Sequence, residues 1–125
     1  MTWVDVSTPL SENVAVWPGD NPFSFTPAAR IVDGDICNVS TVTMSSHCGT
    51  HVDAPWHLED AVPRLDAVNT DIFFGPARVI EIDTADNVSP EHLGNEPLPP
   101  RVLIKTRNSN YSSDAPFHEN YAALT

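Results

Sequence analysis

Short segments in which apolar and polar residues alternate recur along the chain, and this pattern is typical of β-strands. The clearest is residues 36–46, ICNVSTVTMSS, which is rich in β-branched side chains. Because a strand directs successive side chains to opposite faces, this segment predicts a buried strand. Shorter strands are predicted over residues 3–7, 23–31, 77–83 and 101–106.

Glycine and proline divide these segments. Pro18, Gly19 and Asp20 are residues that a tight turn selects, and residues 33–35, Asp-Gly-Asp, predict another turn. Pro27 lies inside the predicted strand 23–31 and would confine it to a sheet edge or a bulge, because proline donates no ladder hydrogen bond.

One short helix is predicted, over residues 89–94. Ser89 would cap it, Pro90 would take its first position and Gly94 would end it. Residues 58–68, LEDAVPRLDAV, allow a helical turn broken by a proline. The remaining connections, a stiff run at 96–100 and a polar stretch at 107–120, are interpreted as linker and surface loop.

The composition indicates one acidic domain over residues 1–125. The net charge of -11, from 17 acidic and 6 basic residues, leaves no basic patch for nucleic acid. No apolar run approaches the ~20 residues of a membrane helix, and the start, MTWVDVS, does not have the pattern of a signal peptide. We therefore expect a cytoplasmic protein in which Cys37 and Cys48 are reduced.

Metal-binding side chains gather in residues 47–57, HCGTHVDAPWH, which hold three of the five histidines. Four candidate ligands there have the same parity: His47, His51, Asp53 and His57. In an extended segment such positions share one face. A helix would also bring two of the histidines together, but Gly49 and Pro55 cost a helix about 1 and 3 kcal/mol. We predict an extended run that turns at residues 49–50 and again at Pro55.

Two imidazoles and a carboxylate form the ligand set that Zn²⁺ or Mn²⁺ takes in catalytic sites, where a position stays open for water. Such a cation lowers the pKa of its water, to about 7 in favourable zinc sites. Asp53 has two oxygens and can also bridge to a second metal. His57 is then either a further ligand or a nearby proton carrier. Cys48 has the opposite parity and is not expected to bind.

Some other side chains that could have a functional role can also be interpreted as ordinary structural or surface residues. Trp17 enters the predicted turn, where it is either a core or lid aromatic or a platform for a flat aromatic substrate, worth ~1 kcal/mol beyond burial. Glu59 and Asp60 follow the motif and are interpreted as solvated loop carboxylates. His92 has no acidic or histidine neighbour at ligand spacing and is interpreted as a surface residue.

Residues 47–57 resemble the HxGTHxDxPxH signature of the cyclase-like metal-dependent hydrolases, whose best-known bacterial members are the kynurenine formamidases. The resemblance extends over nearly all of the chain. The opening WVDVSTPLSENVAVWPGD, the segment CNVSTVTMSSH and the later segments FFGPARVIEID and RVLIKT follow one another in the family order.

The resemblance implies a centre with two zinc ions, with Mn²⁺ also possible. His47, His51 and Asp53 would bind the first metal, and Asp53 would bridge to the second. His57 would donate and accept protons. Trp17 would line the substrate site.

The family takes its remaining ligands, a histidine and a glutamate, from a part that follows residue 125. His118 and Glu119 are not assigned this role, because they precede the helix that comes before those ligands in the family. Thr125 suits the cap of a helix that would begin at the next position. The resemblance thus implies that a partner or a separate segment completes the site.

For fold and function, the resemblance implies an α/β, swivelling β/β/α-type domain with a mixed sheet, here without its C-terminal part, and a homodimer. The implied reaction is hydrolysis of a small aromatic formamide, N-formyl-L-kynurenine, to L-kynurenine and formate in tryptophan degradation. Two alternatives are a relative that opens cyclic amides such as isatin, and a metal-binding remnant without catalysis.

Overall fold

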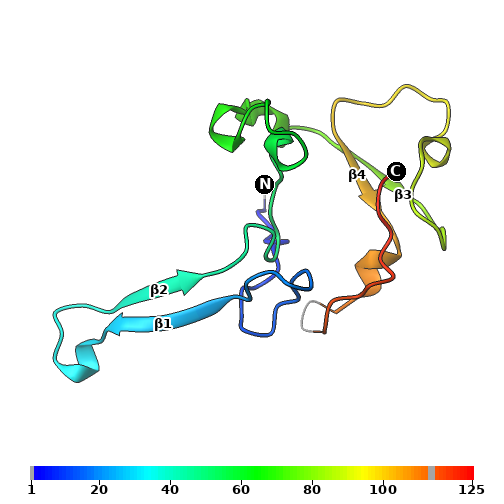
Figure 1. Ribbon diagram of the computed structural model, residues 1–125. Coiled ribbons are helices and arrows are strands. Elements are labelled where there is room, and N and C mark those ends of the chain that lie inside the picture. The colour runs from blue at the N-terminus through cyan, green and yellow to red at the C-terminus, as the bar shows by residue number, and fades with distance from the viewer. Residues whose placement is uncertain (1, 113–114) are drawn as a thin grey trace. The chain divides into compact units, whose positions relative to one another are not determined.

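A computed structural model describes residues 2–112 and 115–125, and the chain divides into two compact units. Unit 1 comprises Met1–His51 and Ser112–His118, and unit 2 comprises Val52–Tyr111 and Glu119–Thr125. In the described residues each unit holds one two-stranded sheet, antiparallel in unit 1 and parallel in unit 2 (Figure 1). These sheets, with short 3-10 helices between strands, fit a small α/β protein.

The sheet of unit 1 is a hairpin of β1 (Ser24–Ala29) and β2 (Val39–Thr43), which extends away from the loops of that unit (Figure 1). Its register shifts between Pro27 and Ala29, in agreement with the prediction that Pro27 would mark a sheet edge or a bulge. The hairpin turns through the 3-10 helix η1 (Ile31–Asp33), and Gly34 adopts a φ of 100°. The turn predicted at residues 33–35 is therefore also correct.

Two strand predictions need correction. Of residues 36–46, only β2 is a strand and it is not buried, since Phe25 and the opposite Val42 are 54% and 52% exposed. The reason is that a two-stranded sheet offers no second layer to cover its faces. Residues 3–7 form no strand, because no described strand pairs with them, and Trp3 is 95% exposed.

The sheet of unit 2 pairs β3 (Arg78–Glu81) with β4 (Val102–Lys105), as the alternating pattern predicted. Ile80 lies opposite Ile104, and both are half-buried. Glu81 lies opposite Lys105, and the carboxylate and ammonium are 2.8 Å apart. Cross-strand pairs of this kind stabilise a register, so the sheet is defined by its side chains as well as by its backbone.

A 3-10 helix, η5 (Pro90–Leu93), lies on the connection between these strands, where the sequence predicted a helix. Ser89 precedes it in an extended conformation, and Gly94 follows with a φ of 74°. Nδ1 of the exposed His92 accepts a hydrogen bond from the N–H of Ser89 at 3.0 Å. His92 is therefore a surface residue that caps the helix, in agreement with its interpretation from sequence. The remaining 3-10 helices of the described chain are η2 (Pro55–His57), η3 (Leu65–Ala67), η4 (Thr70–Phe73) and η6 (Arg107–Asn110).

Residues 113–114 of the polar stretch 107–120 lie outside the described residues, and the described part is more than a surface loop. Asn108 is half-buried and binds the peptide groups of Ala122 on both sides: its Oδ1 accepts from the N–H at 2.7 Å, and its Nδ2 donates to the carbonyl at 2.8 Å. Val88 bonds to the backbone of Ala123 and Thr125 at 2.7 and 2.9 Å. These bonds hold the last described residues within unit 2.

Little apolar surface is buried. Among the described residues the buried apolar side chains are Val14, Cys48, Ile82, Val88 and Ala122. Within the described residues no helix is long and apolar enough to span a bilayer.

Candidate metal centre

The motif lies in an irregular loop, residues 45–53, which we call the metal loop. It begins with a turn in which the N–H of Cys48 donates to the carbonyl of Ser45 at 3.2 Å, and Gly49 then adopts a φ of 66°. The Oγ1 of Thr50 accepts from the N–H of Thr8 at 2.8 Å. The predicted turn at residues 49–50 is correct, but the histidines meet because the backbone curls and not because they share a face of an extended ribbon.

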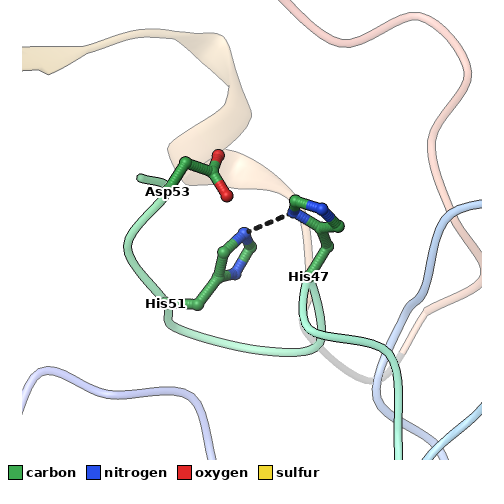
Figure 2. A group of neighbouring side chains, drawn as sticks. All are labelled: His47, His51 and Asp53. Atoms are coloured by element: carbon green, nitrogen blue, oxygen red, sulfur yellow. Dashed lines mark hydrogen bonds between the residues drawn. The ribbon is translucent and has the colours of Figure 1, made fainter. Parts of the chain in front are cut away.

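The metal loop brings three predicted ligands together. One ligand atom each from His47, His51 and Asp53 lies within 4.8 Å of the others. Figure 2 shows the two rings meeting, with the carboxylate of Asp53 turned towards them. The cluster is local to one continuous stretch of backbone, and it is able to hold a divalent cation.

The spacing of the two rings fits a zinc ion. Nδ1 of His47 and Nε2 of His51 lie 3.3 Å apart, with the ring planes at 78°. Two imidazole nitrogens at the usual Zn–N bond length on one tetrahedral ion are also separated by about 3.3 Å. The carboxylate of Asp53, at up to 4.8 Å, would have to approach by up to roughly 1.5 Å to complete the same coordination.

The tautomer of His51 follows from its second contact. Its Nδ1 lies 2.9 Å from the carbonyl oxygen of Gly49. A carbonyl only accepts, so Nδ1 carries the proton and Nε2 presents its lone pair towards His47. A backbone carbonyl that orients a histidine in this way is a common outer partner of metal ligands.

The cluster is open to solvent on one side. His47 is half-buried, whereas His51 and Asp53 are exposed. His47 also lines a shallow pocket of about 190 Å³ together with Thr8, Val14, Ala15 and Gly49. The half-buried His47 thus lies beside a small pocket.

Trp17 lies where the sequence predicted a turn. The N–H of Asp20 donates to the carbonyl of Trp17 at 3.0 Å, and Gly19 adopts a φ of 99°. The indole, 51% exposed, meets the ring of Phe117 edge-to-face, with centroids 5.0 Å apart. Sequence reasoning missed Phe117. Its only signal was an aromatic residue inside a polar stretch.

A second pocket in unit 1, of about 390 Å³, includes Phe117, Val16 and Pro22 in its lining. Val14 and Ala15 line this pocket and also the pocket beside His47. The segment of Val14 and Ala15 therefore lies next to both the pocket that includes Phe117 and the pocket that includes His47.

His57 is not one of the three clustered residues. It is exposed, ends η2, and donates its backbone N–H to the carbonyl of Ala54 at 2.9 Å. Beside it, the guanidinium of Arg64 lies 4.6 Å from the centre of a Trp56 ring. The predicted turn at Pro55 is correct, and the role of His57 stays a prediction.

The remaining candidates lie outside the cluster. Cys48 is buried and Cys37 is exposed, and both are free cysteines in the structure. Among the described residues no second group of metal-binding side chains includes His118 or Glu119.

Comparison with known proteins places this loop in a family. The family model described as "Putative cyclase" matches residues 4–123. The chain belongs to this cyclase family. Its metal loop and all of its described strands therefore lie within the part shared with other cyclase-family members.

Among curated proteins, the cyclase-family chain is similar to kynurenine formamidases. It is 33% identical to one from Bacillus cereus over 116 residues, which cover 91% of this chain and 56% of the relative. It is 38% identical to that of Geobacillus thermodenitrificans over 91 residues, or 73% of this chain and 44% of the relative. The chain thus spans about half the length of the curated relatives that it matches.

Proposed function

We propose that this chain is a metal-dependent amidohydrolase that converts N-formyl-L-kynurenine to L-kynurenine and formate. The observation that carries the proposal is the cluster of His47, His51 and Asp53, within 4.8 Å of one another. The cluster occurs in a chain 33% identical to a curated kynurenine formamidase.

The donor set supports Zn²⁺ as the resident cation, with Mn²⁺ as the second choice. His47 and His51 would bind it through the two nitrogens that face each other, and Asp53 would bind it and bridge to a second ion. A cation of this kind supplies a water of lowered pKa and polarises the carbonyl oxygen of an amide.

The protein side chains would divide the remaining work. His57 would take a proton from the attacking water and give one to the aniline nitrogen as the C–N bond breaks, since imidazole exchanges protons near neutral pH. Trp17 would hold the aromatic ring of the substrate. The exposed indole and its neighbour Phe117 support this role, because they form an aromatic surface.

We further propose that residues 1–125 form one domain of the swivelling β/β/α type and that the active protein is a homodimer. The exposed large apolar side chains, among them Trp3 and Leu58, support a requirement for further burial. The match to about half of each relative supports a second set of ligands, a histidine and a glutamate, from outside residues 1–125.

The test is turnover by the purified chain loaded with Zn²⁺, with metal content measured by elemental analysis. Release of formate and L-kynurenine from N-formyl-L-kynurenine, without opening of isatin, is the expected result. Opening of isatin without turnover of the formamide would contradict this reaction and indicate that the protein opens cyclic amides. Bound zinc without any turnover would indicate a metal-binding remnant.

A further inference from the structure

Ser45 connects the turn at Trp17 to the metal loop. Its hydroxyl donates to Oδ2 of Asp20 at 2.6 Å, and its Oγ accepts from the backbone N–H of His47 at 3.2 Å. All these residues belong to unit 1. One side chain thus connects a carboxylate of the turn to the backbone of a candidate ligand.

The backbone of Ser45 makes two more bonds in the same place. Its N–H donates to the carbonyl of Asn21 at 3.1 Å, and its carbonyl accepts from the N–H of Cys48 at 3.2 Å. Ser45 therefore uses its hydroxyl, its N–H and its carbonyl to hold the two segments together. Cys48, 2% exposed, anchors the same turn by burial.

The bond to Asp20 decides the direction of the hydroxyl. A carboxylate only accepts, so the Ser45 proton points to Asp20 and the oxygen lone pairs remain for the N–H of His47. Bonds to a charged acceptor are stronger than neutral ones. Asp20 and Ser45 are both half-buried, so water competes less for this bond than on an open surface.

We propose that Asp20 and Ser45 are positioning residues of the metal centre. Asp20 acts through Ser45, and Ser45 fixes the backbone of His47 so that its Nδ1 lies 3.3 Å from Nε2 of His51. The proposal deepens the proposed function, because it rests on that cluster being a metal site. It also predicts that the metal affinity depends on the turn that carries Trp17, because the N–H of Asp20 makes the hydrogen bond of that turn.

The experiment is a competition titration of the purified chain with Zn²⁺ against a chromophoric chelator. Ser45→Ala and Asp20→Ala should each weaken zinc binding by about 10-fold, the lower end of the effect of residues that support metal ligands. Ser46→Ala, the same change at an exposed neighbour, and Asp66→Ala in η3 are the matched controls and should bind like the unaltered chain.

Two further measurements separate positioning from general folding. Ser45→Thr keeps the hydroxyl and should restore most of the zinc affinity lost in Ser45→Ala. Substituted Co²⁺ should show a shifted visible spectrum in Ser45→Ala but not in Ser45→Thr. The double variant Asp20→Ala/Ser45→Ala should bind zinc as Ser45→Ala does, because Asp20 acts through Ser45.

The outcomes are distinct. An unaltered chain that binds no Zn²⁺ would overturn the metal centre itself and with it the proposed function. An unaltered chain that binds Zn²⁺, with Ser45→Ala and Asp20→Ala binding equally well, would overturn only the positioning role. Should either alanine variant fail to fold by circular dichroism, Asp20→Asn keeps the size of the side chain, removes its charge and must still weaken binding.

Discussion

The Nδ1–H of His51 donates to the carbonyl oxygen of Gly49 over 2.9 Å, so the backbone of the metal loop decides which nitrogen of His51 faces His47. This backbone needs a glycine, because its φ of 66° lies in the left-handed region. A Cβ at Gly49 would also lie 2.8 Å from Cδ2 of Leu10. The geometry of the ligands therefore depends on a residue that has no side chain to bind a metal.

Gly49→Ala should destabilise the protein and weaken zinc binding. The left-handed conformation alone costs a side chain about 1–2 kcal/mol, and the end of the exposed Leu10 side chain must shift to make room for the added carbon. Gly34→Ala is the matched control, because Gly34 has a φ of 100° but nothing within 4 Å of the added carbon. Thermal unfolding and zinc titration should show a loss of stability in both variants and a loss of affinity only at position 49. Restored zinc binding in Leu10→Ala/Gly49→Ala would identify the contact as the cause.

Asp53→Asn should lower zinc affinity beyond the ~10-fold expected for residues that only support ligands. The amide keeps one oxygen but loses the charge and the ability to bridge two ions. Elemental analysis after dialysis measures the change, with Asp66→Asn as a control for an exposed aspartate. Full metal content in Asp53→Asn would contradict both the ligand and the bridging role.

His57→Ala should keep its metal and lose activity by roughly 10²- to 10⁴-fold, the usual contribution of a general acid or base. The reason is that His57 lies outside the cluster of ligands. Zinc content and the turnover number on N-formyl-L-kynurenine are measured on the same sample. Loss of zinc from this variant would make His57 a ligand instead of a proton carrier.

Trp17→Ala should raise KM by about 2- to 10-fold, which corresponds to the 0.5–1.5 kcal/mol of an aromatic pair, and should change kcat little. Phe117→Leu should shift KM in the same direction by less, since it removes only the ring against which the indole rests. Trp3→Ala, at a residue 95% exposed, is the control. An effect of Trp17→Ala on kcat alone would place Trp17 in the chemistry.

The carboxyl group of Asp5 should titrate below its ordinary pKa of 3.8, because the hydroxyl and the N–H of Ser7 both donate to it. A pKa lowered by folding means that the stabilisation is present above the unfolded pKa and is lost as the pH falls through the folded one. NMR titration of the side chain measures the midpoint. Ser7→Ala should return the midpoint towards 3.8, and an unchanged midpoint would contradict the role of Ser7.

The ligand set was predictable from sequence because it is local. Three side chains in residues 47–53 cannot be far apart, and Gly49 and Pro55 marked the turns correctly. Strands β3 and β4 were also predictable, because their alternation is matched by a partner of the same length.

Long-range partners were not predictable. The valines of residues 3–7 indicate a strand, but a strand also needs a neighbouring edge, which the sequence of one segment does not encode. The edge-to-face contact of Trp17 with Phe117 joins residues far apart in the chain, and so does the hydrogen bond from Asn108 to Ala122. No periodicity marks such pairs.

The two hydrogen bonds of Asn108, to the N–H and to the carbonyl of Ala122, have a practical consequence for storage. Asparagine is a thermolabile residue, and hydrolysis of its side-chain amide leaves an aspartate that can no longer donate to the carbonyl of Ala122. An aged preparation would then lose one of the bonds that hold its last described residues, while the bonds of Val88 and every metal ligand stay chemically intact. Any zinc titration should therefore include a control for deamidation of Asn108, which mass spectrometry detects as a mass increase at this position.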